Sequence, residues 1–594
     1  MKKISSYFWG FAAIAMMAAC SNEELVPEAG DVTLPGIANG EAYLTVRLQD
    51  ASALTRATDG GYKNGVASEH EVNDAQFFFF DKEGVFVGKA SVWNGGVDNG
   101  EHDTGNNVEF KGKTVLVLRG VTETSYPEYL LTVLNAGDFQ PETTLKATSE
   151  ALRQWDNTYK DTKYFVMSTS SYFNNNEEHD KFYYATKVAP SNFQDEPYKD
   201  DSMNPDKVLQ IYVERLAAKV QVTTGPKLQV EENGLYKIKN VSIAGDPNNE
   251  GEPNEGDMDV YVRFSNWGLS GTAKDSYLSK QLNDDWKNKA PFANWMNATD
   301  FRCFWAKSTV YGITDKDKLD LSYTSYKNLS STINGTYDPK NYGYAYCNEN
   351  TNVAENISDN NVVDPAKVTS VLIGAQVCDA EGNALDLVRH NGLLFKKDAY
   401  LNYVVNVVNN ANPFNAYTSY VDETDNETKY KKLDGSYLKL VRDADSKALT
   451  VVVDEQQFAG EKEFYSITEV DGKKVATELS TEDAKKTLQG CLDAYTTDET
   501  LFVCDEAFTN GMMYYAIPIK HLAGFGAKDA IIEGSYGVVR NHWYQIVLDK
   551  LEKLGTGVFD DTEVIIPTTP EQKYYLAATI NILSWKIVNQ SVEL

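Results

Sequence analysis

Short runs of alternating apolar and polar residues recur along the chain and predict β-strands. The first spans residues 42–48, where four apolar residues point to one side: Ala42, Leu44, Val46 and Leu48. The side chains of a strand alternate between its two faces, so this run predicts a strand with one buried face.

A β-hairpin is predicted shortly afterwards. The runs Gln76–Phe80 (QFFFF) and Val85–Val87 flank the turn sequence Asp81–Gly84. A short polar loop containing glycine between two apolar runs is typical of a hairpin.

Strand patterns continue to the end of the chain. They lie at Val115–Leu118, Tyr129–Leu134, Phe165–Met167, Leu209–Val222, Lys237–Ile243, Ser370–Ile373, Tyr400–Val408, Ala448–Val453, Tyr514–Ile519, Val538–Leu548 and 577–594. Thr143–Trp155 is the best helical candidate, and Val538–Leu548 also permits a helix by composition. Short strands separated by loops favour antiparallel sandwiches over an alternating βαβ fold. We therefore expect a mainly β protein.

The N-terminus has the pattern of an export signal. Lys2 and Lys3 precede an apolar segment that ends in Ala18-Ala19-Cys20. A basic start, an apolar stretch and small residues before the cut are typical of a signal peptide, here residues 1–19. The cysteine after the small pair resembles a bacterial lipobox, which implies lipidation of Cys20. The alternative is an ordinary signal peptide followed by an unrelated cysteine.

Composition excludes several classes of protein. The 594 residues hold 56 Lys and Arg against 86 Asp and Glu, a net charge of −30. A chain this acidic repels the phosphates of nucleic acids and anionic lipids. Beyond the leader, no apolar run approaches the roughly 18 residues of a membrane-spanning helix. We expect no nucleic-acid partner.

No catalytic or metal-binding motif stands out. The six histidines form no HExxH motif and no Cys/His cluster, so we expect no enzyme activity, no metal and no cofactor. Five cysteines follow Cys20, so at least one is free or pairs between molecules. Cys491 and Cys504 are one candidate pair, although burial as free thiols is the simpler expectation.

Several segments resemble the fimbrillins of Bacteroidetes, most closely the major subunit of the short fimbriae. They are the lipobox Cys20, Phe77–Val87, Tyr129–Gly137, Val213–Val222, Tyr514–Leu522, Tyr536–His542 (YGVVRNH) and Trp585–Leu594. The resemblance implies two transthyretin-like β-sandwich domains and a role in assembly rather than catalysis. The region 246–360 departs from the family by its length and its many asparagines.

The sequence features divide the chain into five expected parts. Gly225-Pro226 is a plausible domain boundary, because both residues favour turns. We expect a signal peptide at 1–19, a propeptide at 20–56, an N-terminal domain at 57–225, a C-terminal domain at 226–576 and a terminal strand at 577–594.

The two ends of the chain suggest how such a protein assembles. Arg56 lies in a loop of small and polar residues, where an Arg-specific protease would cut between Arg56 and Ala57. Loss of the strand at 42–48 would open a groove, which the terminal strand of a second copy could fill. The apolar residues of this donor strand are Ile580, Ile582, Trp585, Ile587, Val588, Val592 and Leu594. The alternative is that both ends are ordinary strands of one subunit and that Arg56 stays uncut.

The sequence thus predicts a fimbrial shaft subunit, lipidated at the outer membrane as a precursor and then part of a surface fimbrium. Expected partners are further copies of the chain, accessory anchor and tip subunits, the protease, and a receptor on host or bacterial cells. Three alternatives remain: a tip or anchor protein of the same fold, a largely helical glycan-binding lipoprotein of the outer membrane, and a secreted glycosidase.

Overall fold

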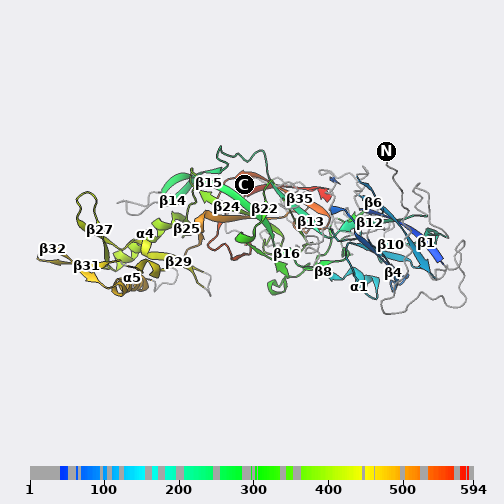
Figure 1. Ribbon diagram of the computed structural model, residues 1–594, viewed down its shortest axis with the longest axis horizontal. Helices are drawn as coiled ribbons and strands as arrows, with labels where there is room; N and C mark the ends of the chain where they lie inside the picture. The colour runs from blue at the N-terminus through cyan, green and yellow to red at the C-terminus, as the bar shows by residue number, and fades with distance from the viewer. Residues whose placement is uncertain are drawn as a thin grey trace, which may run out of the picture.

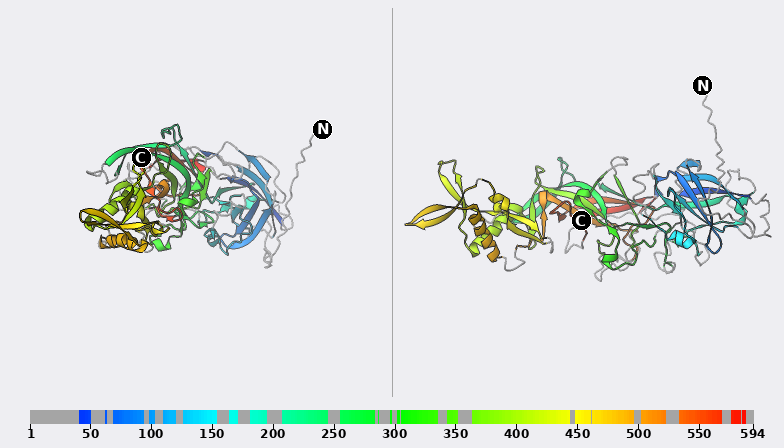
Figure 2. Two further views of the ribbon diagram at one scale, coloured as in Figure 1. Left: turned by 60° about the vertical axis from the view of Figure 1, so that its left-hand side comes forward. Right: turned by 60° about the horizontal axis from the view of Figure 1, so that its bottom comes forward.

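The computed structural model of this protein shows an elongated molecule, with the N-terminal strands at one end and the long helices at the other (Figures 1 and 2). It describes residues 41–50, 62–63, 69–93, 98–102, 110–119, 126–153, 164–170, 181–194, 207–244, 255–283, 286, 296–297, 302–303, 305–334, 343–351, 363–443, 448–460, 462–495, 502–521, 533–567, 576–583 and 585–587. The predicted mainly β fold with several antiparallel sheets is confirmed.

A ten-stranded sheet forms the N-terminal end of the molecule. Its strands, in order across the sheet, are β4 (Phe86–Trp93), β3 (Asp74–Phe80), β7 (Tyr129–Leu134), β9 (Met167–Thr169), β12 (Leu209–Arg215), β1 (Glu41–Asp50), β6 (Phe110–Arg119) and β5 (Asp98–His102), with β10 (Thr186–Lys187) beside β7 and β11 (Phe193–Gln194) beside β1.

The phenylalanine run of β3 shows why this sheet is buried on both faces. Phe77 and Phe79 belong to one apolar core, whereas Phe78 and Phe80 belong to a second core on the opposite face. Side chains alternate across a strand, so an uninterrupted apolar run fits only a strand that is covered on both sides. The predicted hairpin is confirmed, since β3 pairs with β4 and Gly84 supplies the positive φ of the turn, 80°.

Two sheets share the largest core, in the middle of the molecule. The six-stranded sheet contains β2 (Tyr62–Lys63), β39 (Trp585–Ile587), β35 (His542–Leu551), β13 (Ala218–Thr224) and β23 (Tyr344–Cys347), with β38 (Leu576–Leu583) also paired to β35. The nine-stranded sheet contains β33 (Glu506–Phe508), β25 (Leu387–His390), β26 (Leu393–Lys396), β14 (Tyr236–Ala244), β15 (Glu255–Ser270), β24 (Ser370–Cys378), β34 (Met512–Pro518) and β36 (Thr556–Gly557), with β22 (Ser331–Thr332) beside β15.

A separate unit, which we call the distal module (residues 397–505), is inserted between β26 and β33 at the end opposite β1 (Figure 1). It has an apolar core that is largely its own. Its elements are α4 (Lys397–Ala411), α5 (Thr481–Tyr495), a four-stranded sheet of β28 (Thr428–Lys432), β27 (Tyr417–Val421), β31 (Phe464–Val470) and β32 (Lys473–Leu479), and the hairpin of β29 (Leu438–Arg442) and β30 (Leu449–Val453).

Small elements link the larger sheets. The two-stranded pairs are β16 (Thr272–Ala273) with β20 (Leu321–Ser322), β17 (Ser276–Tyr277) with β8 (Leu152–Arg153), β18 (Met296–Asn297) with β19 (Arg302–Cys303), and β21 (Thr324–Ser325) with β37 (Val564–Ile565). Single 3-10 turns lie at Pro190–Asn192, Lys316–Lys318, Tyr326–Asn328, Gly435–Tyr437, Glu455–Phe458 and Thr509–Gly511.

Two predicted elements are wrong. The strand expected at Tyr400–Val408 is the middle of helix α4, whose buried residues recur at helical spacing: Tyr400, Leu401, Val404, Val405 and Val408. The helix expected at Thr143–Trp155 is only one turn long, α1 (Leu145–Ser149), and Leu152 already belongs to β8. The ambiguous segment Val538–Leu548 contributes strand β35, not a helix.

Candidate functional site

β1 lies inside the ten-stranded sheet although it comes first among the described elements. It pairs antiparallel with β6 along Glu41–Gln49 and parallel with β12 along Val46–Asp50. Ala42, Leu44 and Val46 are fully buried in one of the two cores of this sheet. Since β1 separates β12 from β6, this strand fills a slot whose two walls come from other parts of the chain.

The residues of that core come from strands far apart in sequence. The buried residues next to β1 in the sheet are Leu116 and Leu118 of β6, Leu209 and Ile211 of β12, and Phe193 of β11. Loss of β1 would therefore uncover apolar side chains together with the backbone groups of two strand edges. The side chain of Leu48, and all of Arg56, Ala57 and Cys20, lie outside the described residues.

The C-terminal segment forms two strands beside β35. Ile580 and Ile582 belong to β38, opposite Ile546 and Tyr544 of β35 in an antiparallel pair. Trp585 and Ile587 belong to β39, which pairs with the short strand β2. The remaining predicted donor residues, Val588, Val592 and Leu594, lie outside the described residues. The first and the last described strands therefore occupy different sheets of one subunit.

A network of buried charges joins these two sheets. The chain passes from β12 in the N-terminal sheet to β13 in the six-stranded sheet, and carries Arg215 and Lys219 across the junction. Glu69 forms an ion pair with Lys219 at 2.7 Å and accepts a hydrogen bond from the Tyr346 hydroxyl at 2.5 Å. The Arg215 Nε donates to the backbone carbonyl of Glu69 at 2.6 Å. All three charged side chains are buried.

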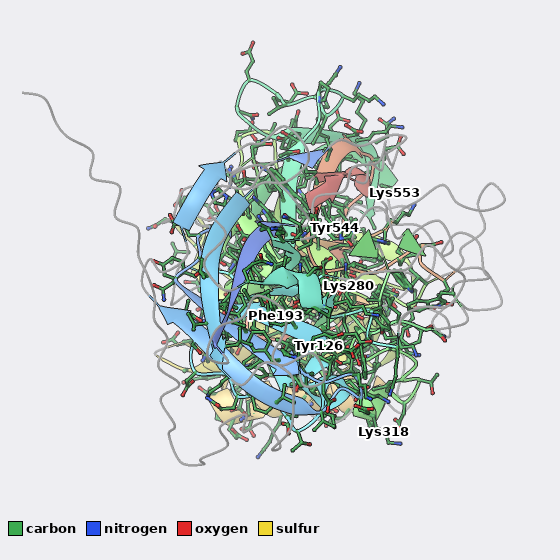
Figure 3. The ribbon with its side chains drawn as sticks, turned by 90° about the vertical axis from the view of Figure 1, so that its right-hand side faces the viewer. Tyr126, Phe193, Lys280, Lys318, Tyr544 and Lys553 are labelled. Atoms are coloured by element: carbon green, nitrogen blue, oxygen red, sulfur yellow. The ribbon has the colours of Figure 1, made fainter. Side chains whose placement is uncertain are left out.

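Two more buried ion pairs lie at the same junction. Glu214 pairs with Lys280 at 2.8 Å, and Glu349 pairs with Arg540 at 2.7 Å. Arg540 also donates to the carbonyls of Leu278 and Tyr277, at 3.0 and 2.7 Å. Figure 3, which looks along the molecule from its N-terminal end, shows Lys280 near the centre of the projection. Buried charges are tolerated when they are paired and hydrogen-bonded, and each of these carboxylates has a cation within 2.8 Å.

The segment YGVVRNH owes its composition to this junction. Gly537 has a φ of 128°, and a Cβ at this position would lie 2.7 Å from the carbonyl oxygen of Asn350. Arg540 supplies the buried ion pair, and the next residue, Asn541, accepts a hydrogen bond from Arg215 at 2.8 Å. The segment is thus structural, and sequence reasoning found it only through a family resemblance.

Side chains with ionisable groups, such as Tyr544 and four cysteines, are buried inside the protein. The Tyr544 hydroxyl accepts from the backbone N–H of Val539 at 2.9 Å and lies 2.8 Å from His521 Nδ1, while burial raises the pKa of Tyr544 well above its ordinary value. Cys347, Cys378, Cys491 and Cys504 are buried, and the thiols of Cys491 and Cys504 are free, so this candidate pair is not a disulfide. Among the described residues, no three His, Cys, Asp or Glu side chains gather as a metal site requires. Within the same residues, no helix has the length and hydrophobicity to cross a membrane.

Comparisons with solved structures give distant similarities. A fimbrilin (fimA) from Porphyromonas gingivalis is 11% identical over 92% of this chain and 98% of its own, with a TM-score of 0.34. A fimbrial assembly protein from Parabacteroides distasonis is 13% identical over 66% of this chain and 100% of its own, with a TM-score of 0.25. The fimbrial anchor protein Mfa2 from Porphyromonas gingivalis is 8% identical over 65% of this chain and 94% of its own, with a TM-score of 0.16.

The sequence of the C-terminal region is more informative than these distant structures. No curated protein matches the chain. Residues 506–591 match the sequence model of the family described as "Major fimbrial subunit protein type IV, Fimbrillin, C-terminal". The match begins at β33, where the distal module ends, and runs through β35 and β38 past β39. Residues 506–591 of this chain are therefore similar to the C-terminal region of fimbrillins.

Proposed function

We propose that this protein is a structural subunit of surface fimbriae that polymerises by protease-triggered strand exchange and supports adhesion. The observation that carries the proposal is the place of β1. This strand precedes every other described element, yet it lies between β6 and β12 with fully buried apolar side chains. A cut after Arg56 would separate it from the rest of the chain. The family match at residues 506–591 supports a fimbrial role rather than catalysis.

The vacated slot has the chemistry to hold a replacement strand. Burial of four apolar side chains contributes about 1.5–3 kcal/mol each, or about 6–12 kcal/mol before the costs of ordering. Backbone hydrogen bonds to the two strand edges add about 0.5–1.5 kcal/mol per bond. A strand held in this way would dissociate slowly, so the junction suits a durable filament.

The C-terminal strand of a second copy is the proposed replacement. Because β38 already pairs with β35 along Leu576–Leu583, and β39 (Trp585–Ile587) pairs with β2, the part that enters the neighbour would begin after Ile587. Val588, Val592 and Leu594 continue the apolar pattern there, as Ala42, Leu44 and Val46 do in β1. A contact between different ends of two copies does not close on itself, so it extends a filament.

Export and partners complete the proposal. Cys20 carries the lipid that holds the precursor at the outer membrane, and the mature subunit then joins the surface fimbrium. An Arg-specific protease, accessory anchor and tip subunits and a cell-surface receptor are the proposed partners. Similarity to a fimbrial assembly protein and to a fimbrial anchor protein is in keeping with such partners. The mainly β fold argues against the largely helical glycan-binding class.

N-terminal sequencing of filaments purified from the native cell surface tests the proposal. We expect the sequence to begin at Ala57, and an Arg56→Ala variant to remain as an uncut precursor without filaments. An Arg56→Lys variant, which keeps the charge but removes the preferred site of an Arg-specific protease, is the matched control for charge. Filaments whose subunits begin before Ala42 would contradict strand exchange.

A further inference from the structure

A cleft of about 520 Å³ opens where the distal module joins the rest of the molecule. One wall is the β14 segment from Lys239 to Ser242, and the second is the start of β26 with the preceding turn, Gly392–Leu394. The third side is Glu552–Leu554, directly after β35. This cleft is remote from the slot of β1, which belongs to a different sheet.

The cleft exists because β14 continues past its neighbour in the sheet. Among the described residues, β14 pairs with β26 only at Ala244, opposite Phe395. β26 does not extend further along β14, because the chain enters it from β25 through the turn Asn391–Gly392, in which both residues have positive φ, 50° and 78°. No other described strand lies on this side of β14, so backbone N–H and C=O groups of its earlier residues form a free sheet edge.

The walls of the cleft carry surplus positive charge. Arg389 pairs with Glu506 at 2.7 Å, and Glu552 pairs with Lys550. Lys239 and Lys553 are both exposed, and neither has an ion-pair partner within the described part of the chain. The cleft thus has two lysines without a described ion-pair partner, in a chain whose net charge is −30. They would favour an anionic ligand.

Apolar side chains lie between these lysines. Leu394 and Leu554 are almost fully buried, whereas Leu393 keeps 44% of its surface exposed beside them. An extended peptide places successive side chains on opposite sides at period two. Such a ligand could therefore turn its apolar residues toward the leucines and its acidic residues toward the lysines.

We propose that this cleft binds a short extended peptide in which apolar and acidic residues alternate, added to the free edge of β14. The backbone edge supplies strand hydrogen bonds, the leucines supply apolar contact, and the lysines select the charge. A peptide fits these features better than an anionic polysaccharide, which has no backbone to pair with a sheet edge. The register shift between Ile238 and Val241 limits the length of strand that this edge can accept.

The test uses the full chain and fluorescence polarisation with a labelled peptide, acetyl-Val-Glu-Val-Glu-Val-amide. We expect saturable binding, and a Kd raised about tenfold or more in the double variant Lys239→Glu with Lys553→Glu. Each side chain is exposed, so folding should not change. Lys187 is another exposed lysine, and it lies outside the cleft. Lys187→Glu makes the same kind of charge change and should leave the Kd for the peptide nearly unaltered.

Three further probes decide between the sources of binding. A peptide with proline at the central position cannot donate its central backbone N–H and should bind more weakly. A peptide with lysine in place of glutamate should not bind. No binding of the acidic peptide, or equal binding by the double variant, would overturn the proposal. So would a heparin tetrasaccharide that binds through Lys239 and Lys553 when the peptide does not.

Discussion

Single residues at the junction of the sheets contribute strongly to the stability of the fold, because they are charged and removed from water. Glu69, Lys219 and Arg215 are each less than 2% exposed. The Lys219 ammonium also lies 4.1 Å from the ring centroids of Tyr344 and Trp543. Transfer of such groups out of water is costly unless their partners are in place, so loss of one partner harms the fold more than loss of both.

Replacing Lys219 alone should therefore destabilise the protein strongly. We expect Lys219→Met to lower the free energy of unfolding by about 3–5 kcal/mol, since it leaves Glu69 buried without its cation. The double variant Glu69→Gln with Lys219→Met should recover much of that loss. Urea denaturation followed by tryptophan fluorescence measures both.

A surface pair provides the control for this comparison. Lys318 and Asp315 form an ion pair at 3.0 Å with side chains 75% and 45% exposed, so Lys318→Ala should cost about 0–1 kcal/mol. If the double variant were no more stable than Lys219→Met, the explanation by an uncompensated charge would be wrong.

Asp74 should make the stability of the N-terminal sheet depend on pH. Burial raises the pKa of its carboxyl, although hydrogen bonds from the backbone of Gly137, the side chain of Asn73 and the backbone of Ala136 act in the opposite direction. A folded-state pKa above the unfolded value means that protonation favours folding. This contribution is complete below the unfolded pKa and is lost as the pH rises through the folded pKa.

Asp74→Asn removes that titration and keeps a similar shape. We expect the variant to gain stability relative to the natural chain at pH 7. The gain should shrink as the pH falls through the raised folded-state pKa and should be lost below the unfolded value of about 4. Thermal unfolding across this pH range measures the difference. A difference that stayed constant with pH would exclude ionisation of Asp74 as the cause.

At the scale of elements, the distal module is a unit with its own interior. Helices α4 and α5 pack on the β29–β30 hairpin, and Leu488 of α5 is fully buried in that core. Its four-stranded sheet has few buried residues and carries exposed apolar side chains such as Val421 and Val470, 58% and 53% exposed. Such a unit should unfold without the sheets that hold the two chain ends.

Truncation of Leu488 tests that independence. We expect Leu488→Ala to cost about 2–5 kcal/mol, because it removes three heavy atoms from a closed core. Hydrogen exchange measured by mass spectrometry should rise in residues 397–505 and stay unchanged in β3 and β7. Lys486→Ala, on an exposed position of the same helix, is the control. An equal rise across the whole chain would show one cooperative unit instead.

At the scale of the whole molecule, the first and the last described strands lie in different sheets. β1 belongs to the N-terminal sheet, and β38 and β39 belong to the six-stranded sheet. If the proposed cut removes β1, the empty slot in one sheet and the terminal segment in another would suit head-to-tail assembly. The distal module lies at the pole opposite β1, clear of the slot in its own subunit (Figures 1 and 2).

A single charge should block this assembly on one face of the donor strand and not on the other. If residues beyond Ile587 enter the slot of a neighbour, Val592→Asp would bury an unpaired carboxylate and abolish filaments. Ser591→Asp, one residue earlier, would point to the opposite side of the strand and should permit them. Electron microscopy of cells expressing each variant, with export checked by immunoblot, measures the outcome. Normal filaments from Val592→Asp would contradict the proposed donor strand.

Much of the local structure could be predicted from the sequence. The alternation at residues 42–48 predicted β1, and the phenylalanine run with its polar turn predicted the β3–β4 hairpin, because side-chain period and turn chemistry act over a few residues. Tyr400–Val408 misled the prediction, since its many valines favour a strand. Contacts with the rest of the distal module outweighed that preference and made it a helix.

The sequence by itself determined the strand-rich class, the apolar faces of the terminal segments and the acidic charge, since each follows from composition or from near neighbours. Only the tertiary structure decided that β1 is an interior strand, that Glu69 meets Lys219 across 150 positions of sequence, and that residues 397–505 form a module of their own. Those outcomes depend on which distant segments pack together and exclude water. The hydrophobic effect is non-directional and stabilises contact with any apolar segment, so an apolar pattern does not specify its partner.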